Sequence, residues 1–244
     1  MDNIITNSLK NGLNAQDING KTSLIWAVRT SDIKTVKELL ALGADTSIVD
    51  NVGESVLHYA TRQNNLEILN IILDTNVDIN LKSEGAYKQT AIFTPAEASR
   101  IPVLKILLER GANPDIQDKY KMTPLQWAAQ QGKIEAVKTL LEFGASVNTK
   151  NHKGVTTLMS ATIKGITECV QILIEAGAEI NSAAKDGFTE LMYAAYYGNE
   201  ETLQYLLISG ANKDAVSKKG ETALSIAKKK NFNTIITILE SSNT

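Results

Sequence analysis

The chain has 244 residues, of which 43% are hydrophobic and 21% are charged, as in an ordinary water-soluble folded protein. No apolar run reaches the roughly 18 to 20 residues that cross a bilayer, and the sequence that follows Met1 resembles no secretion signal, so we expect no membrane insertion. The 25 basic side chains nearly balance 27 acidic ones, which disfavours a nucleic acid as the partner.

The sequence contains a single cysteine, Cys169. An intramolecular disulfide is therefore excluded, and a metal site with several thiolate ligands is excluded with it. Together with the missing secretion signal, this favours a reducing compartment, and we expect a cytoplasmic protein that is monomeric.

One short motif recurs along the chain, a Thr or Ser followed two residues later by Leu or Ile. It occurs at Thr22, Ser55, Thr90, Thr123, Thr156, Thr189 and Thr222. The successive spacings are 33, 35, 33, 33, 33 and 33 residues. A fixed period of this length is typical of proteins built from stacked repeats.

Each repeat unit predicts two short helices. When the Thr is counted as position 1, Leu dominates position 3 and Ala dominates position 6. An apolar pair occupies positions 18 and 19 in the first six units, and a glycine follows it in five of them. The Thr is a good N-cap for a first helix, and the glycine is a good stop for a second one. Because one helix pair cannot bury its own apolar faces, successive units must stack into a solenoid, and the fold class is all-α.

These columns resemble the ankyrin repeat family. Residues Thr123–Ala128 read Thr-Pro-Leu-Gln-Trp-Ala and residues Ser55–Ala60 read Ser-Val-Leu-His-Tyr-Ala, close to the family motif T-P-L-H-x-A. Gly-Ala-Asp or Gly-Ala-Asn follows the second helix at Gly43, Gly111 and Gly210. The resemblance implies stacked helix-turn-helix units with β-turn or hairpin fingers, whose members act mostly as protein-interaction modules.

We expect one ankyrin-repeat domain over residues 1–244, with about seven units including caps. An N-terminal cap covers residues 1–16, with a helix in residues 3–10. Repeats are expected at residues 17–49, 50–82, 83–117, 118–150, 151–183 and 184–216, and a C-terminal capping repeat at residues 217–244. The cap carries Lys228–Lys230 and Glu240, which give its outer face the polarity that an uncovered end requires.

No catalytic or phosphate-binding signature occurs in the sequence. The two histidines, His58 and His152, are about three repeats apart, and stacked units are spaced by roughly 10 Å, so they cannot bind one metal ion together. We interpret His58 as a structural residue of the turn region and Cys169 as a small core side chain rather than a nucleophile. We therefore expect that the chain is not an enzyme and that it needs neither a cofactor nor a metal.

A partner-binding surface is predicted from the helical periodicity. At roughly 100° per residue, positions 5, 8 and 9 of the first helix point away from its buried stripe, into the groove that the family presents on its concave side. Aromatic residues collect there and at the turn tips. The predicted partner-binding residues are Trp26, Tyr59, Tyr87, Tyr120, Trp127, Phe188, Tyr193, Tyr196 and Tyr197. The alternative is that position 5 is buried between neighbouring first helices.

The third unit departs from the pattern in two ways. It has two extra residues within Lys82–Gln89, and Pro95 stands where the other units have Ala. We interpret Thr94 as an N-cap with Pro95 at the first helical position, so that this helix starts about one turn late. The insertion predicts a lengthened finger around Tyr87 that contacts the partner, and neutral drift in a surface loop is the alternative.

The expected function is that of a non-catalytic scaffold that binds another protein through the concave face of its first helices and its finger tips. The alternative is a targeting, inhibitory or regulatory module of an associated enzyme or of a larger multidomain protein. Residues 210–244 carry 6 basic against 3 acidic side chains, which could attract an acidic partner segment. Solubility of the last helix is the simpler explanation of that charge.

Overall fold

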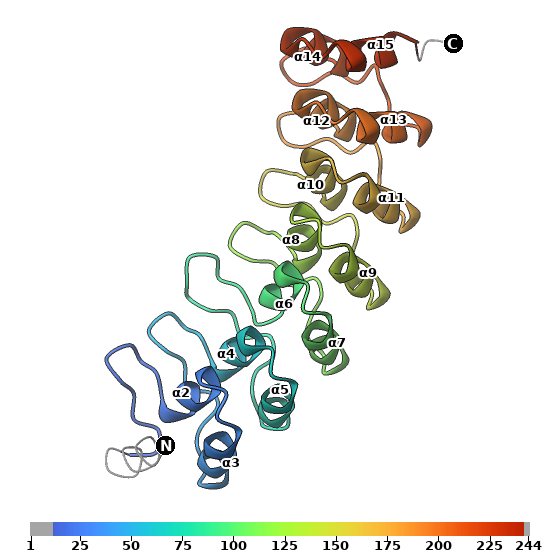
Figure 1. Cartoon of the computed structure of the whole chain (residues 1–244). Helices are drawn as coiled ribbons and strands as arrows, with labels where there is room; N and C mark the ends of the chain where they lie inside the picture. The colour runs from blue at the N-terminus through green and yellow to red at the C-terminus, as the bar shows by residue number, and fades with distance from the viewer. Residues whose placement is uncertain (1–11, 242–244) are drawn as a thin grey trace. The chain divides into compact units, whose positions relative to one another are not determined.

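The computed structural model describes residues 12–241, so the helix expected in residues 3–10 lies outside the described part. Within residues 12–241 the chain forms fourteen α-helices and no β-strand, which confirms the all-α class (Figure 1). The helices follow one another in pairs. The first helix of each pair, here called the A helix, is α2 (Ser23–Arg29), α4 (Val56–Gln63), α6 (Phe93–Ala98), α8 (Pro124–Gln130), α10 (Thr157–Lys164), α12 (Glu190–Tyr197) or α14 (Ala223–Lys230). The second, the B helix, is α3 (Ile33–Ala41), α5 (Leu66–Leu73), α7 (Ile101–Glu109), α9 (Ile134–Glu142), α11 (Thr167–Glu175), α13 (Glu200–Ile208) or α15 (Asn233–Ser241).

The chain divides into two compact units, whose described parts are residues 12–119 and 120–241. In the first unit α2 packs on α4 and α4 on α6, while α3 packs on α5 and α5 on α7. In the second unit α10 packs on α8 and on α12, which packs on α14, and the B helices α9, α11, α13 and α15 follow the same order. Each unit is therefore a stack in which every helix pair covers the apolar face of its neighbour, as the repeat pattern predicts.

The expected N-caps are present in most repeats. The hydroxyl of Thr22 accepts a hydrogen bond from the backbone N–H of Ile25, and Thr156 caps α10 in the same way through Met159 at 3.1 Å. Glycine ends α10 and α12, because Gly165 and Gly198 adopt φ values of +70° and +77° that other residues rarely adopt. The Thr and Gly columns thus set where the helices begin and end.

The third A helix corrects one expectation. Helix α6 begins at Phe93, two residues later in its repeat than the other A helices, but its N-cap is Ile92, so the prediction of Thr94 as the N-cap is wrong. Phe93 is fully buried, and burying this ring outweighs the gain from a polar cap. Pro95 is then the third helical residue, where its missing N–H costs no helical hydrogen bond.

Neighbouring fingers are joined by backbone hydrogen bonds within each unit. In the first unit, Glu84 N donates to Val52 O at 2.8 Å and Lys119 N donates to Tyr87 O at 2.8 Å. In the second unit, His152 N donates to Tyr120 O at 3.0 Å. The backbone N–H groups of Lys185 and Lys218 make the equivalent bonds to the fingers that precede them. The lengthened third finger is thus held on both sides. Gly53 permits this approach, because a Cβ there would lie 2.5 Å from Glu84 N.

The interpretation of Cys169 as a core side chain is confirmed. Its thiol is fully buried on α11. Burial raises its pKa to about 12, with a smaller contribution from Glu168, so the thiolate that a nucleophile needs is not formed near neutral pH.

Glu190 is a fully buried acid in the first turn of α12. One carboxyl oxygen accepts a hydrogen bond from the hydroxyl of Thr156 at 3.4 Å, and the other has no partner among the described residues. Burial raises the pKa of Glu190 to about 8, more than its hydrogen bonds lower it. The folded second unit therefore carries this carboxyl largely protonated at neutral pH.

We expect Glu190→Gln to stabilise the protein increasingly as the pH rises from 5 to 8. The folded state holds the Glu190 proton more tightly than the unfolded state. The free energy of unfolding of the wild-type protein therefore falls as the pH rises, by up to about 1.4 kcal/mol per pH unit, between the pKa of 4.5 for a free carboxyl and the folded pKa of about 8. The glutamine stays neutral throughout. Urea unfolding of both proteins at pH 5, 6.5 and 8 measures the difference, and a difference that is constant with pH would contradict the assignment.

Candidate functional site

Trp26 on α2 is partly accessible, with 36% of its surface exposed. Its indole N–H donates to the Asp17 carboxylate at 2.9 Å, and the Arg29 guanidinium lies 4.4 Å from the ring centroid. Position 5 of this repeat is therefore not buried between neighbouring A helices. The indole is nevertheless held by two groups of its own repeat.

Tyr59 on α4 corrects the expectation of an accessible aromatic at this position. Only 7% of its surface is exposed, and its hydroxyl donates to the Asp50 carboxylate at 2.6 Å. The Arg62 guanidinium covers the ring at 5.1 Å from the centroid, and Arg29 of the preceding repeat lies at 5.8 Å. The two arginines and the hydrogen bond leave little of this ring for a partner.

Asp50 is the buried centre of this network. Its carboxylate also accepts hydrogen bonds at 3.0 Å from the backbone N–H groups of Val52 and Glu54, and Lys21 Nζ lies 3.7 Å away. Burial alone would raise the pKa of Asp50, but the hydrogen bonds and the charge of Lys21 outweigh it and lower the pKa. The pKa of Tyr59 is raised by burial and by the Asp50 carboxylate, so the tyrosine remains a donor.

The pairing of a turn aspartate with position 5 is a feature that the sequence reasoning missed. Asp17 and Asp50 each lie five residues before the recurring Thr or Ser and bind the aromatic at position 5 of the same repeat. The signal in the sequence was that Asp at the turn position, five residues before the Thr or Ser, occurs together with Trp or Tyr at position 5. In the sixth repeat the turn column holds Ala184, and Tyr193 packs against the apolar cluster that contains it.

His58 has the structural role that its motif implies. Its Nδ1 accepts from the backbone N–H of Ser55 at 3.2 Å, and its Nε2 lies 3.2 Å from the carbonyl of Gln89 in the next finger. Burial lowers the pKa of His58 more than Gln89 and Glu54 raise it, so the ring is neutral near pH 7. The histidine joins the start of α4 to the lengthened finger.

Three other predicted residues lie at or near the surface. Tyr87 at the tip of the lengthened finger is 48% exposed, and a cavity of about 110 Å³ lies beside it against His58 and Arg62. Tyr120 is 38% exposed and its ring lies 5.5 Å from that of His152. Trp127 on α8 is half-buried. These residues are partly accessible in their own units.

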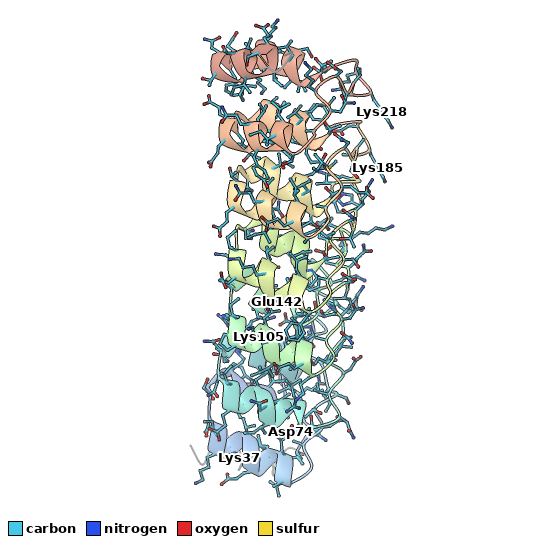
Figure 2. The ribbon with its side chains drawn as sticks, turned by 90° about the vertical axis from the view of Figure 1, so that its right-hand side faces the viewer. Lys37, Asp74, Lys105, Glu142, Lys185 and Lys218 are labelled. Atoms are coloured by element: carbon cyan, nitrogen blue, oxygen red, sulfur yellow. The ribbon has the colours of Figure 1, made fainter. Side chains whose placement is uncertain are left out.

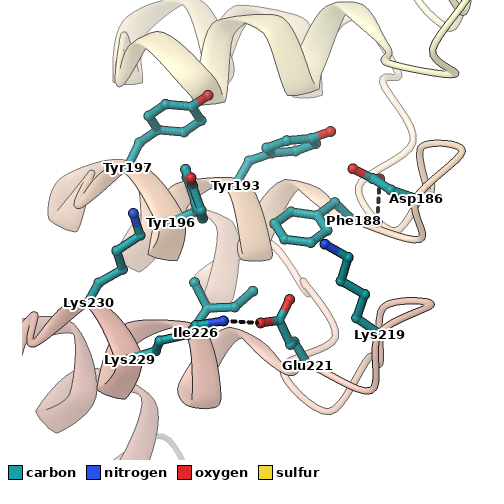
Figure 3. A pocket seen from close by; sticks show the side chains of 10 residues that line it. All are labelled: Asp186, Phe188, Tyr193, Tyr196, Tyr197, Lys219, Glu221, Ile226, Lys229 and Lys230. Atoms are coloured by element: carbon teal, nitrogen blue, oxygen red, sulfur yellow. Dashed lines mark hydrogen bonds and ion pairs between the residues drawn. The ribbon is translucent and has the colours of Figure 1, made fainter.

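The remaining four predicted residues come together in one place in the second unit. Figure 3 shows them on one side of a cavity of about 490 Å³, with side chains of the C-terminal repeat on the other. We call this cavity the aromatic pocket. Its lining residues are Asp186, Phe188, Tyr193, Tyr196, Tyr197, Lys219, Glu221, Ile226, Lys229 and Lys230.

The aromatic side of the pocket is a connected set of rings. The Phe188 centroid lies 5.3 Å from that of Tyr193 and 6.3 Å from that of Tyr196, and Tyr197 lies 5.1 Å from Tyr196. Tyr196 is 40% exposed and Tyr197 is 50% exposed. Burial, followed by the charge of Asp186, raises the pKa of Tyr193 to about 12, which keeps its hydroxyl protonated. The rings thus form a wall that is both preformed and open.

The opposite side of the pocket is charged. Lys230 Nζ lies 4.0 Å from the Tyr196 ring centroid, and Lys229 pairs with Glu221 at 3.1 Å (Figure 3). Ile226, which is 3% exposed, lies between them at the base of the pocket. An apolar wall faced by ammonium groups can bind a ligand that is itself partly apolar and partly anionic.

Residues 12–241 offer neither a metal site nor a membrane-spanning helix. That part of the chain contains no group of three or more His, Cys, Asp or Glu side chains placed to hold a metal ion. Within the same residues, every helix is too short or too polar to cross a bilayer.

The stacked helix pairs with joined hairpin fingers define a helical repeat protein. The sequence profile of ankyrin repeats, in three copies, matches residues 2–83, 96–184 and 191–243. The chain belongs to the ankyrin-repeat family, as its motifs indicated. Ankyrin repeats are a general protein–protein interaction module.

Similar proteins carry these repeats within much longer chains. The chain is 31% identical over 97 residues to the E3 ubiquitin-protein ligase hecd-1 of Caenorhabditis elegans, which covers 39% of this chain and 4% of the ligase. It is 31% identical over 115 residues to the human transient receptor potential cation channel subfamily A member 1, covering 47% and 10%. It is 42% identical over 59 residues to the putative ankyrin repeat protein L271 of Acanthamoeba polyphaga mimivirus, covering 24% and 8%. The matched region is thus a tenth of these relatives or less.

We expect Asp50→Asn to destabilise the first unit by about 1 to 3 kcal/mol, because it weakens a charged, buried hydrogen-bond network around the Tyr59 hydroxyl. The low folded pKa of Asp50 means that its contribution is present above the pKa of 3.8 for a free carboxyl and is lost as the pH falls through the folded pKa. The deficit of the variant should therefore be full at pH 7 and shrink below pH 4. Urea unfolding measures it.

Asp45→Asn is the matched control. Asp45 is an exposed carboxylate that bonds the backbone and hydroxyl of Ser47. Equal effects of the two substitutions at pH 7 would show that burial of Asp50 contributes nothing.

Proposed function

We propose that this chain is a non-catalytic scaffold that binds another protein through the A-helix face and the finger tips, with the aromatic pocket as the main contact. The observation that carries the proposal is the contrast between Tyr59 in the first unit and the tyrosine pair of the second unit. The ring of Tyr59 is held by Asp50 and two arginines, whereas Tyr196 and Tyr197 present 40% and 50% of their surfaces to solvent.

Exposed tyrosines on rigid helices are suited to binding. A tyrosine buries a large area when a partner docks, with only two side-chain torsions to fix, so such residues often dominate the energy of an interface. The pocket volume of about 490 Å³ is also within the range of roughly 300 to 1,000 Å³ that is typical of ligand sites. Both facts support the second unit as the anchoring part of the scaffold.

A second candidate is a targeting, inhibitory or regulatory module of an enzyme or of a larger protein. The observation that favours it is the small share of each relative that matches: the names of two relatives describe a ubiquitin ligase and a cation channel, and the matched region is 4% and 10% of their lengths. In this case the chain still acts by binding. The two candidates differ in what is bound, an independent partner or the enzyme to which the repeats are attached.

We expect Tyr196→Ala/Tyr197→Ala to weaken retention of the partner at least about tenfold in affinity capture from lysate of the expressing cells, because truncating two hot-spot rings costs more than about 1.4 kcal/mol. Phe143→Ala is the control, since Phe143 is an exposed aromatic (36%) at the end of a B helix. Circular dichroism and thermal unfolding check the fold of each variant. Equal capture by all three proteins would place the contact elsewhere.

The lengthened finger is tested separately with Tyr87→Ala. The substitution leaves the backbone bond from Lys119 to Tyr87 O intact while removing the exposed ring at the tip. We expect a severalfold loss of capture if this finger contacts the partner, as an exposed aromatic anchor would give. Undiminished capture would indicate that the two extra residues are neutral.

A further inference from the structure

The aromatic pocket has an apolar interior that the protein leaves open. Phe188, Tyr193 and Tyr196 form a continuous wall, and Ile226 closes the base. Tyr193 has Ala184 rather than a turn aspartate in its repeat, so its ring packs on apolar atoms. The cavity is large enough for one bulky aliphatic or aromatic side chain of a ligand.

The cations around the pocket are not neutralised equally. Lys229 is paired with Glu221 at 3.1 Å, and its neighbour Lys228 is paired with Glu240 at 2.8 Å. Within the part of the chain that the structure describes, no carboxylate lies within ion-pair distance of Lys219 or Lys230. Figure 3 shows the Lys219 side chain extending toward Phe188 and the Lys230 side chain toward Tyr196, one at each end of the pocket.

The carboxylates at the rim do not cancel this charge. The Glu221 side chain is bound to Lys229, which leaves Asp186 as the remaining acid of the lining against two lysines, Lys219 and Lys230. Further exposed lysines lie at the finger tips of the second unit. Lys185 and Lys218 are seen at the finger edge in Figure 2, and Lys153 precedes them by one finger. The surface that leads to the pocket is therefore basic.

We propose that the aromatic pocket binds an acidic peptide segment of the partner, with one large apolar side chain inserted against Phe188, Tyr193 and Tyr196. Carboxylates that flank this side chain bind Lys219 at one end and Lys230 at the other. Such charge-assisted hydrogen bonds are about twice as strong as neutral ones, and the Lys230 ammonium group is already positioned over the Tyr196 ring. The inference rests on the proposed function and names the chemistry of the partner.

A cationic ligand fits the same rings less well. Aromatic side chains often bind ammonium groups, but the Tyr196 face is occupied by Lys230 at 4.0 Å. A second cation would be placed beside Lys219, Lys229 and Lys230, and the like charges would repel it. Charge complementarity therefore favours the acidic segment.

The test is a selection from a displayed library of random 12-residue peptides on the intact chain, followed by fluorescence anisotropy with the most enriched peptide. We expect enriched peptides to carry a net negative charge and one large apolar residue. Lys219→Ala/Lys230→Ala and Tyr193→Ala/Tyr196→Ala should each weaken binding at least about tenfold. Lys34→Ala/Lys105→Ala removes two exposed B-helix lysines, changes the net charge equally, and should leave binding nearly unchanged.

A charge exchange makes the assignment specific and does not depend on how well an alanine variant folds. Lys219→Glu/Lys230→Glu should abolish binding of the acidic peptide and restore it to a peptide whose flanking acids are replaced by lysine. Both substituted side chains are exposed, and thermal unfolding verifies the fold.

Several results would overturn the inference: enriched peptides that are neutral or basic, equal loss with both lysine pairs, no enrichment, or binding to phosphatidylserine vesicles alone through Lys219 and Lys230. In each of these cases the proposed scaffold function is judged separately, by whether Tyr196→Ala/Tyr197→Ala abolishes capture of the protein partner. Failure of one test is thus distinguishable from failure of the other.

Discussion

The structure depends on one constraint: a pair of short helices cannot bury its apolar faces alone, so each pair must be covered by the next. This constraint fixes the Leu and Ala positions of every A helix, such as Leu57 and Ala60, which are completely buried. It also requires hydrogen bonds from one finger to the next. The outward stripe of the A helices and the tips of the fingers are not bound by this constraint and remain free to vary, so binding residues can be placed there.

Within that outward stripe, a second interaction holds aromatic rings in place. Asp17 and Asp50 bind the position-5 side chains of their own repeats, and arginines cover the rings. Such aromatics stabilise the first unit. Where the turn column holds Ala184 instead, Tyr193 packs on an apolar cluster and joins the wall of an open pocket. The aromatic ring nine residues after the turn column therefore has different neighbours in these repeats.

The two buried acids differ in how their surroundings shift the pKa. Asp50 is supplied with a hydroxyl, two backbone N–H groups and a lysine, and its pKa falls. Glu190 has one weak hydroxyl donor, and its pKa rises to about 8. Both are carboxyls with nearly no exposure. The difference lies in the hydrogen-bond donors that neighbouring residues provide. Because of it, the two carboxyls make the stabilities of their units depend on pH in opposite directions.

The sequence alone determined the family, the helix pairs and most of the capping, because those depend on local residue patterns that recur every 33 residues. It also predicted that Tyr193, Tyr196 and Tyr197 point outward from their helix and that Phe188 lies at a turn tip. It could not show that Tyr59 is enclosed, that Ile92 rather than Thr94 caps α6, or that Lys219 and Lys230 face the same rings. These features depend on tertiary contacts, some within a repeat, such as Asp50 with Tyr59, and some between repeats, such as Arg29 with Tyr59, and only the tertiary structure shows which side chains meet.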